Sequence, residues 1–198
     1  MSRTTNTSTR QAAKHGKSRR RPAVRRSLIA ISAAAVLGTA GMSVSAYAGG
    51  SDGLPPKSDR NKANAEILDP RCSVPPDADM KVNKQVHDIA VQRGANDKVM
   101  LATFEAGWVE SHMNNLNCGD RDSLGVFQQR PSAGWGTPEQ CMDVVHATNA
   151  FLDQAIPNDK NNPDQTAGQL AQSVQRSAYP DRYDQNEGKA RELINAAG

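Results

Sequence analysis

Residues 97–111 have the sequence DKVMLATFEAGWVES, which predicts a buried helix. Apolar side chains occur on nearly every side of this helix, and a helix that is apolar all round is buried. Asn96 or Asp97 can cap its start. Glu105 and Glu110 are the exceptions, because burying an ionised carboxylate without partners is costly. We therefore expect at least one of these two carboxylates to lie at an opening.

The segments on both sides of this stretch predict further helices. Residues 80–93 carry apolar side chains at helical spacing. Two capping-box patterns follow, one at Thr137, which opens a helix with a proline at its first position, and one at Thr166, which opens a helix to about residue 178. Residues 180–197 predict the last helix.

The segments between these helices are polar. Residues 114–135 are dense in Asn, Gly, Asp, Ser and Pro, and they predict a long loop region with a short hairpin near residues 124–128. Residues 157–165 predict a second polar loop. No long alternating run indicates a large sheet. The sequence therefore predicts a mainly α domain with a small irregular or β region in its middle.

Residues 1–48 have the order of a signal peptide. They contain nine Lys or Arg and no Asp or Glu, then a moderately apolar run at 28–44, and then the small-x-small sequence Ala46-Tyr47-Ala48. A membrane anchor is the alternative, but the run is short against the about 20 apolar residues that a span needs. The pair Arg25-Arg26 resembles a twin-arginine signal, with the general secretory route as the alternative. We expect a secreted or wall-associated protein without stable membrane insertion after cleavage.

The charge of the chain divides at the same point. The whole chain has a formal charge of +3, but residues 49–198 hold 15 basic and 21 acidic residues, a charge of −6. The basic character therefore belongs to the leader and gives no reason to expect nucleic-acid binding. Residues 49–64, rich in Gly, Pro, Ser and charge, predict a flexible linker. Residues 65–198 predict a single domain, expected to be monomeric.

Three cysteines follow the leader, namely Cys72, Cys118 and Cys141. A disulfide is the default in an oxidising compartment, and an odd count leaves one thiol over. We expect the pair Cys118–Cys141 with Cys72 free, because Cys118 and Cys141 flank one loop region. The sequence allows all three pairings. No spacing resembles a zinc site.

Glu110 is the residue with the clearest chemical potential. It closes the apolar helix, and a carboxylic acid in an apolar pocket has a raised pKa because low dielectric disfavours the anion. Such an acid stays protonated near neutral pH and can protonate a glycosidic oxygen. Without any further signal, the alternative is a structural acid that pairs with Arg121 or Arg130.

The spacing after Glu110-Ser111 resembles that of soluble lytic transglycosylases and goose-type lysozymes. Their pattern is Glu-Ser, followed by Gly-Leu-Met-Gln-x-Met-Pro beginning fifteen positions after the glutamate. Here Gly125, Gln128 and Pro131 lie fifteen, eighteen and twenty-one positions after Glu110. The stretch from residue 115 to 125 also looks like bacterial and phage cell-wall-lysin domains. The resemblance implies a lysozyme-like α-rich fold with its acid at the end of the central helix.

By this resemblance Glu110 would be the catalytic acid and base. The implied substrate-binding residues are Ser111, Gly125, Gln128, Gln129 and Tyr179. The chain departs from the family pattern at Val126-Phe127 and at Arg130, where the family has Leu-Met and Met. The aromatic element usual near the family's end is echoed by residues 178–180, so that Tyr179 or Tyr183 would lie in the groove.

The implied reaction is cleavage of the β-1,4 bond between N-acetylmuramic acid and N-acetylglucosamine in peptidoglycan strands, without metal or cofactor. We favour a lytic transglycosylase, in which the sugar's own 6-hydroxyl attacks. A hydrolase would use water and usually a second carboxylate, for which Asp120 and Asp122 are the candidates. The main alternative is a non-catalytic wall-binding or structural protein, which the charge of −6 favours because it gives no steering toward an anionic wall. A secreted interaction protein that uses its free cysteine is a third alternative.

Overall fold

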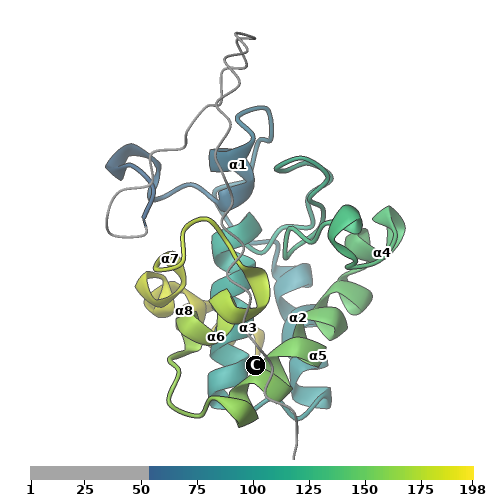
Figure 1. The fold of residues 1–198 in the computed structure, drawn as a ribbon, viewed down its shortest axis with the longest axis vertical. Helices are drawn as coiled ribbons and strands as arrows, with labels where there is room; N and C mark the ends of the chain where they lie inside the picture. The colour runs from purple at the N-terminus through teal and green to yellow at the C-terminus, as the bar shows by residue number, and fades with distance from the viewer. Residues whose placement is uncertain (1–53) are drawn as a thin grey trace, which may run out of the picture. The chain divides into compact units, whose positions relative to one another are not determined.

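The computed structural model describes residues 54–198, and helices form 59% of them (Figure 1). The predicted signal peptide, residues 1–48, lies outside the described residues. No strand occurs within residues 54–198, which confirms the prediction of a mainly α protein. In chain order the elements are the 3-10 helix η1 (Lys57–Asp59), α1 (Asn64–Leu68), α2 (Met80–Gln92), α3 (Asp97–Ser111), the 3-10 helix η2 (Pro131–Ala133), α4 (Pro138–Met142), α5 (Val144–Asn161), α6 (Ala167–Gln175), α7 (Arg182–Gln185) and α8 (Glu187–Ala197).

Helix α3 is the central element of this part of the chain. It contacts α1, α2, α5, α6, α7 and α8, so that nearly every side of it is covered (Figure 1). Phe104 and Val109 are fully buried in the main core. The Asn96 side chain caps the helix by accepting a hydrogen bond from the Val99 N–H at 2.9 Å. The predicted bounds, capping residue and burial of this helix are all confirmed.

The C-terminus of α3 is a sharp turn that fixes the position of Glu110. His112 and Met113 both adopt left-handed backbone conformations, with φ of 52° and 58°. The Met113 N–H turns back to donate to the carbonyl of Gly107 at 3.0 Å. A Cβ on Gly107 would lie 2.2 Å from the Met113 sulfur, so a larger residue at this position would force the buried Met113 side chain to move. Glu110 is thereby held in the last turn of a buried helix.

The two helices with predicted capping boxes begin where the sequence indicates, but the first of them is divided at a point that the sequence pattern did not indicate. Both capping boxes, at Thr137 and Thr166, are present. The helix that begins after Thr137 stops at Asp143, because the Asp143 carboxylate caps a new helix, α5, by accepting from the N–H groups of Val145 and His146.

Two predicted loop or helix boundaries are wrong. Helix α5 continues through Pro157 to Asn161, where we expected a loop, since the proline removes only one hydrogen bond from a helix whose Phe151 and Leu152 are fully buried. The predicted final helix, residues 180–197, is divided at Asn186 into α7 and α8.

The polar region at residues 114–135 contains a single β-bridge in place of the predicted hairpin. The N–H of Leu124 and the carbonyl of Gln129, and the reverse pair, are each 2.9 Å apart. The small irregular region expected in the middle of the domain is therefore present, with one antiparallel contact.

The expected flexible linker, residues 49–64, is wrong over its described part. Leu54, Ala63 and Asn64 are 4%, 0% and 1% exposed, and α1, which begins at Asn64, packs on α3. The segment is polar on average, and its composition therefore gives no sign that a few of its side chains are buried. None of the helices in residues 54–198 combines the length and hydropathy that crossing a membrane requires.

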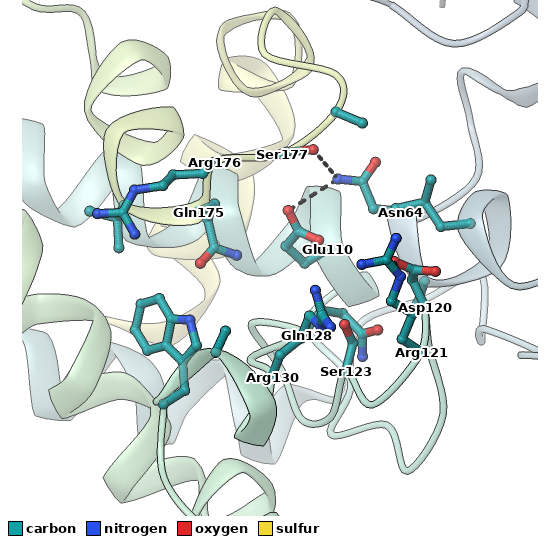
Figure 2. Close-up of a pocket in the computed structure, with 16 residues that line it drawn as sticks. Asn64, Glu110, Asp120, Arg121, Ser123, Gln128, Arg130, Gln175, Arg176 and Ser177 are labelled. Atoms are coloured by element: carbon teal, nitrogen blue, oxygen red, sulfur yellow. Dashed lines mark hydrogen bonds and ion pairs between the residues drawn. The ribbon is translucent and has the colours of Figure 1, made fainter. Parts of the chain in front are cut away.

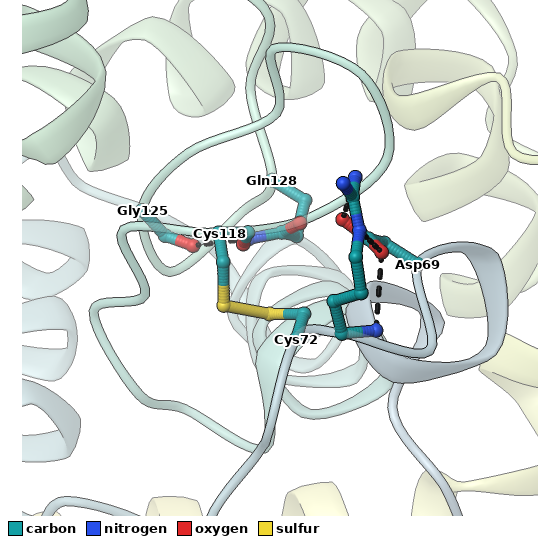
Figure 3. Close-up of a disulfide and its surroundings, with 6 residues drawn as sticks. Asp69, Cys72, Cys118, Gly125 and Gln128 are labelled. Carbon is teal, nitrogen blue, oxygen red and sulfur yellow. Dashed lines mark hydrogen bonds and ion pairs between the residues drawn. A yellow bond between two sulfur atoms is a disulfide. The ribbon is translucent and has the colours of Figure 1, made fainter.

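The disulfide joins Cys72 to Cys118, so the expected pair Cys118–Cys141 is wrong (Figure 3). Because residues 54–72 fold back over the domain, Cys72 reaches the loop that carries Cys118, and the two Cα atoms lie 5.4 Å apart. With the two cysteines 46 positions apart in the sequence, the chain-entropy model gives a stabilisation of about 4 kcal/mol. Cys141 is free and fully buried, so it offers no surface thiol for a partner.

Candidate active site

A cleft of about 500 Å³ opens beside the C-terminal end of α3 (Figure 2). Its walls come from three segments that are far apart in the sequence: α1, the loop region from Asp120 to Trp135, and the end of α6 with the residues after it. Glu110 is the one residue of α3 that lines it. The cleft therefore depends on packing that brings residues 64–68, 120–135 and 174–178 around a single carboxyl group.

The side chains of Asn64 and Tyr183 both donate to the Glu110 carboxyl. The Asn64 side-chain amide donates to Glu110 Oε1 at 3.0 Å, and the Tyr183 hydroxyl donates to the same oxygen at 2.5 Å. Asn64 also donates to the Ser177 hydroxyl at 3.1 Å, as Figure 2 shows. Because Oε1 accepts both hydrogen bonds from Asn64 and Tyr183, the acidic proton of a neutral Glu110 belongs on Oε2.

Arg182 orients Asn64 from behind. Its guanidinium donates to the Asn64 side-chain carbonyl and to the backbone carbonyls of Lys62 and, at 3.3 Å, Arg60. Arg182 is itself only 3% exposed. With the Asn64 carbonyl accepting from Arg182, its NH2 group must face Glu110, so that one buried cation fixes the direction of the amide.

The surroundings of Glu110 act on its pKa in opposite directions. Glu110 is only 6% exposed, and this burial raises its pKa above the ordinary value. The hydrogen bonds from Tyr183 and Asn64, and the positive charge of Arg182, act against this rise by favouring the anion. Glu110 is thus an acid whose pKa lies above its ordinary value. Hydrogen-bond donors for its conjugate base are already in place.

The structure brings three of the predicted site residues into the cleft. Glu110, Asp120 and Gln128 line it. Among the described residues, the other predicted site residues lie outside the lining, and these are Ser111, Asp122, Gly125, Gln129 and Tyr179.

The predicted residues outside the lining support the cleft walls. The Ser111 hydroxyl donates to the carbonyl of Val126 at 2.7 Å, and the Gln129 side chain donates to the carbonyl of Ala147 at 2.9 Å. A Cβ on Gly125 would lie 2.1 Å from the carbonyl oxygen of Cys141, and its φ is +78°. Gly125 therefore allows the backbone of Cys141 to approach closely. We had expected it to allow the close approach of a ligand.

Gln128 lines the cleft while bracing the loop beside it. Its side-chain amide donates to the carbonyls of Cys118 and Gly125, at 3.1 and 3.2 Å (Figure 3). Its backbone is left-handed, with φ of 49°. The loop that follows the disulfide is thus fastened to the same residue that faces the cleft.

The two candidates for a second carboxylate differ in their surroundings. Asp120 lines the cleft. Asp122 instead accepts hydrogen bonds from Arg130 at 2.8 Å and from the N–H and hydroxyl of Ser132, and these bonds hold its pKa well below the usual range. Asp122 is therefore an anchored anion that closes the loop, and Asp120 is the carboxylate with access to the cleft.

Glu105, the other carboxylate of α3, is fully buried away from the cleft. Neither of its oxygens has a hydrogen-bond partner among the described residues. Burial, with smaller contributions from the negative charges of Asp184 and Glu187, raises its pKa to about 8. Glu105 is a neutral acid inside the core at pH 7, and the expectation that at least one of the two carboxylates lies at an opening is met by Glu110.

The sequence reasoning missed the groups that hold Glu110. Asn64 belongs to the stretch that we expected to be a linker, and Arg182 carried no local signal. Tyr183 was named only as an alternative to Tyr179. Asn64 does not cap α1, whose N-cap is Ala63, so no local capping pattern marks its role beside Glu110.

Comparisons and metal chemistry add no assignment to this geometry. No family model matches the sequence, and a search of curated proteins found no match. Within residues 54–198, no group of three or more His, Cys, Asp or Glu side chains is placed to hold a metal ion.

Proposed function

We propose that this protein is an exported enzyme that cleaves the β-1,4 bond between N-acetylmuramic acid and N-acetylglucosamine in peptidoglycan. The observation that carries the proposal is the Glu110 carboxyl, buried at the end of α3, raised in pKa and exposed to a cleft of about 500 Å³. General acid catalysis requires a group that is protonated at working pH and within reach of the leaving oxygen. The spacing of Gly125, Gln128 and Pro131 after Glu110 supports the same assignment.

The chemistry assigned to Glu110 has two steps. Its Oε2 proton passes to the glycosidic oxygen as the bond from that oxygen to the muramic acid C1 breaks, which releases the N-acetylglucosamine hydroxyl. The 6-hydroxyl of the same muramic acid then bonds to C1 and gives its proton back to Glu110, so that an anhydro product forms and no water is consumed. Asn64 and Tyr183 stabilise the carboxylate between the two steps because both donate to its Oε1.

A transglycosylase is favoured over a hydrolase within this proposal. Of the two carboxylates considered for activating water, Asp122 is outside the lining and held by Arg130. Asp120 is the remaining candidate for a hydrolase. Mass analysis of the product ends separates the two reactions, since a transglycosylase gives anhydro ends and a hydrolase gives reducing ends.

The direct test is release of muropeptides from purified sacculi by the wild-type protein, Glu110→Gln and Glu105→Gln. We expect Glu110→Gln to lower release by about a hundredfold or more, because it removes the transferable proton. Glu105→Gln is the matched control, since it makes the same isosteric change five residues away on the same helix and outside the cleft. Equal release by wild type and Glu110→Gln would contradict the proposal and favour the non-catalytic wall-binding alternative.

A further inference from the structure

The cleft is basic although the domain is acidic. Arg121, Arg130 and Arg176 all line it, against the two carboxyl groups of Glu110 and Asp120. Residues 49–198 as a whole carry a charge of −6. The field that a ligand meets is set by nearby groups more than by the net charge. The net charge therefore does not argue against an anionic ligand in this cleft.

Two of the three arginines keep their guanidinium groups available. Arg130 is engaged by Asp122 at 2.8 Å. Arg121 is 3.9 Å from Asp120, beyond hydrogen-bond distance, and its side chain is 72% exposed. Within residues 54–198, the exposed guanidinium of Arg176 takes part in no hydrogen bond or ion pair. Arg121 and Arg176 are thus exposed cations in the cleft that have no strong internal partner.

The backbone at these two arginines is an independent observation. Arg121 and Arg176 have φ of 56° and 52°, in the left-handed region that glycine adopts without steric cost. Together with Gln128, they make up three of the five non-glycine residues with positive φ among the described residues, and all three line the cleft. Unfavourable backbone conformations kept at a cleft point to function there.

The two arginines come from different walls. Arg176 follows the end of α6, Arg121 belongs to the loop after the disulfide, and Figure 2 shows them on opposite sides of Glu110. A polymer that passes over Glu110 would therefore meet a guanidinium on either side of the bond that is cut. Guanidinium groups bind carboxylates in a paired, directional manner that neutral sugars cannot reproduce.

We infer that Arg121 and Arg176 select glycan strands that bear free carboxylates, on the sugar or on attached peptides, over neutral β-1,4 glycans. This inference rests on the proposed function for the identity of the polymer, but not for its cleavage. It makes the two arginines specificity residues that act through binding, on both sides of the acid.

The test is a co-sedimentation assay with the full chain carrying Glu110→Gln, so that the polymer stays intact. Three samples of sacculi are compared: untreated sacculi, sacculi stripped of phosphate polymers with hydrofluoric acid, and stripped sacculi that are then amidated to neutralise their carboxylates. We expect about fivefold weaker binding to the amidated sacculi, the size expected for two exposed ion pairs. Adding Arg121→Gly and Arg176→Gly should abolish this difference, whereas the control Lys84→Gln, an exposed cation outside the cleft, should preserve it.

The glycine substitutions are chosen because they suit the backbone. We expect the melting temperature of the doubly substituted chain to stay within about 3 °C of its parent, so that lost binding is not lost folding. Equal binding to amidated and to stripped but unamidated sacculi would overturn the inference. A preference for unamidated sacculi that survives the double substitution would also overturn it. Binding lost on removal of phosphate polymers would overturn it in favour of a phosphate ligand. A preference that holds while the wild-type protein releases no muropeptides would support this inference and contradict the cleavage proposal alone.

Discussion

Glu110 and Glu105 lie five residues apart on α3, and both are buried, but their surroundings differ. Glu110 has two donors on one oxygen and a cleft beside it, whereas Glu105 has no hydrogen-bond partner among the described residues. Burial raises the pKa of both. A raised pKa therefore does not by itself distinguish a candidate catalytic acid from a carboxyl that is merely enclosed by the core. The distinguishing features are the donors that receive the anion and the access for a ligand.

The largest expected effect concerns Glu105 and the pH dependence of stability. Its pKa rises from an ordinary value of 4.5 to about 8 on folding, so that between these values the unfolded chain releases a proton that the folded chain keeps. Stability should therefore fall as pH rises from 4.5 to 8, by at most about 1.4 kcal/mol per pH unit. Denaturant unfolding at a series of pH values should show this decline in wild type and a flatter profile in Glu105→Gln.

The matched control for that experiment is Glu110→Gln. The raised pKa of Glu110 in the wild-type protein also lowers stability as pH rises, but Asn64, Tyr183 and Arg182 oppose that rise in pKa. We therefore expect Glu110→Gln to change the slope of stability against pH less than Glu105→Gln does. If the profile of Glu105→Gln were as steep as that of wild type, the core carboxyl would have to be ionised at neutral pH, and the contrast between the two glutamates would be lost.

A smaller effect is expected from the residue that positions Glu110. Asn64→Leu removes a donor to Oε1 and the acceptor for Arg182. Muropeptide release should fall by about tenfold to a hundredfold, as expected when a reacting group is displaced by a fraction of an ångström to one ångström. Arg182→Lys is the companion variant, because it keeps the charge but loses the forked contact to Asn64 and the backbone. Full activity in both variants would show that the donors are not needed to position the acid.

The smallest effect is expected for Tyr183→Phe. Removing the hydroxyl takes away a hydrogen bond that favours the Glu110 anion, so the pKa of Glu110 rises further. The alkaline limb of the pH–rate profile should move to higher pH, and the maximal rate should fall by about fivefold to tenfold. Glu105 is the reference here too. The decline in stability with pH that is due to Glu105 should be the same in Tyr183→Phe as in the wild-type protein. A limb that moves to lower pH would contradict the assigned direction of the hydrogen bond.

Local signals in the sequence predicted the parts of the fold that local interactions determine. The bounds of α3, the cap at Asn96 and the capping boxes at Thr137 and Thr166 depend on neighbours within a few residues. Spacing along the chain also selected Glu110 and Gln128, which line the cleft. The contacts that hold Glu110 were out of reach, because they join residues separated by 46 and 73 positions.

The errors have the same physical origin. Proximity in the sequence favours the pair Cys118–Cys141, but the fold places Cys72 against Cys118. The polar composition of residues 54–64 indicates a linker, but Ala63 and Asn64 are buried. A segment that is polar on average can still supply a decisive buried side chain when the rest of the domain provides its partners.

The covalent link between Cys72 and Cys118 makes the cleft depend on the redox conditions around the protein. The segment that precedes Cys72 brings Asn64 to Glu110, while Cys118 begins the loop that carries Asp120 and Arg121. A chain held with both thiols reduced would keep Glu110 on its helix but would have two walls joined only by weaker contacts. The two walls of the cleft are therefore joined covalently only after both thiols have been oxidised.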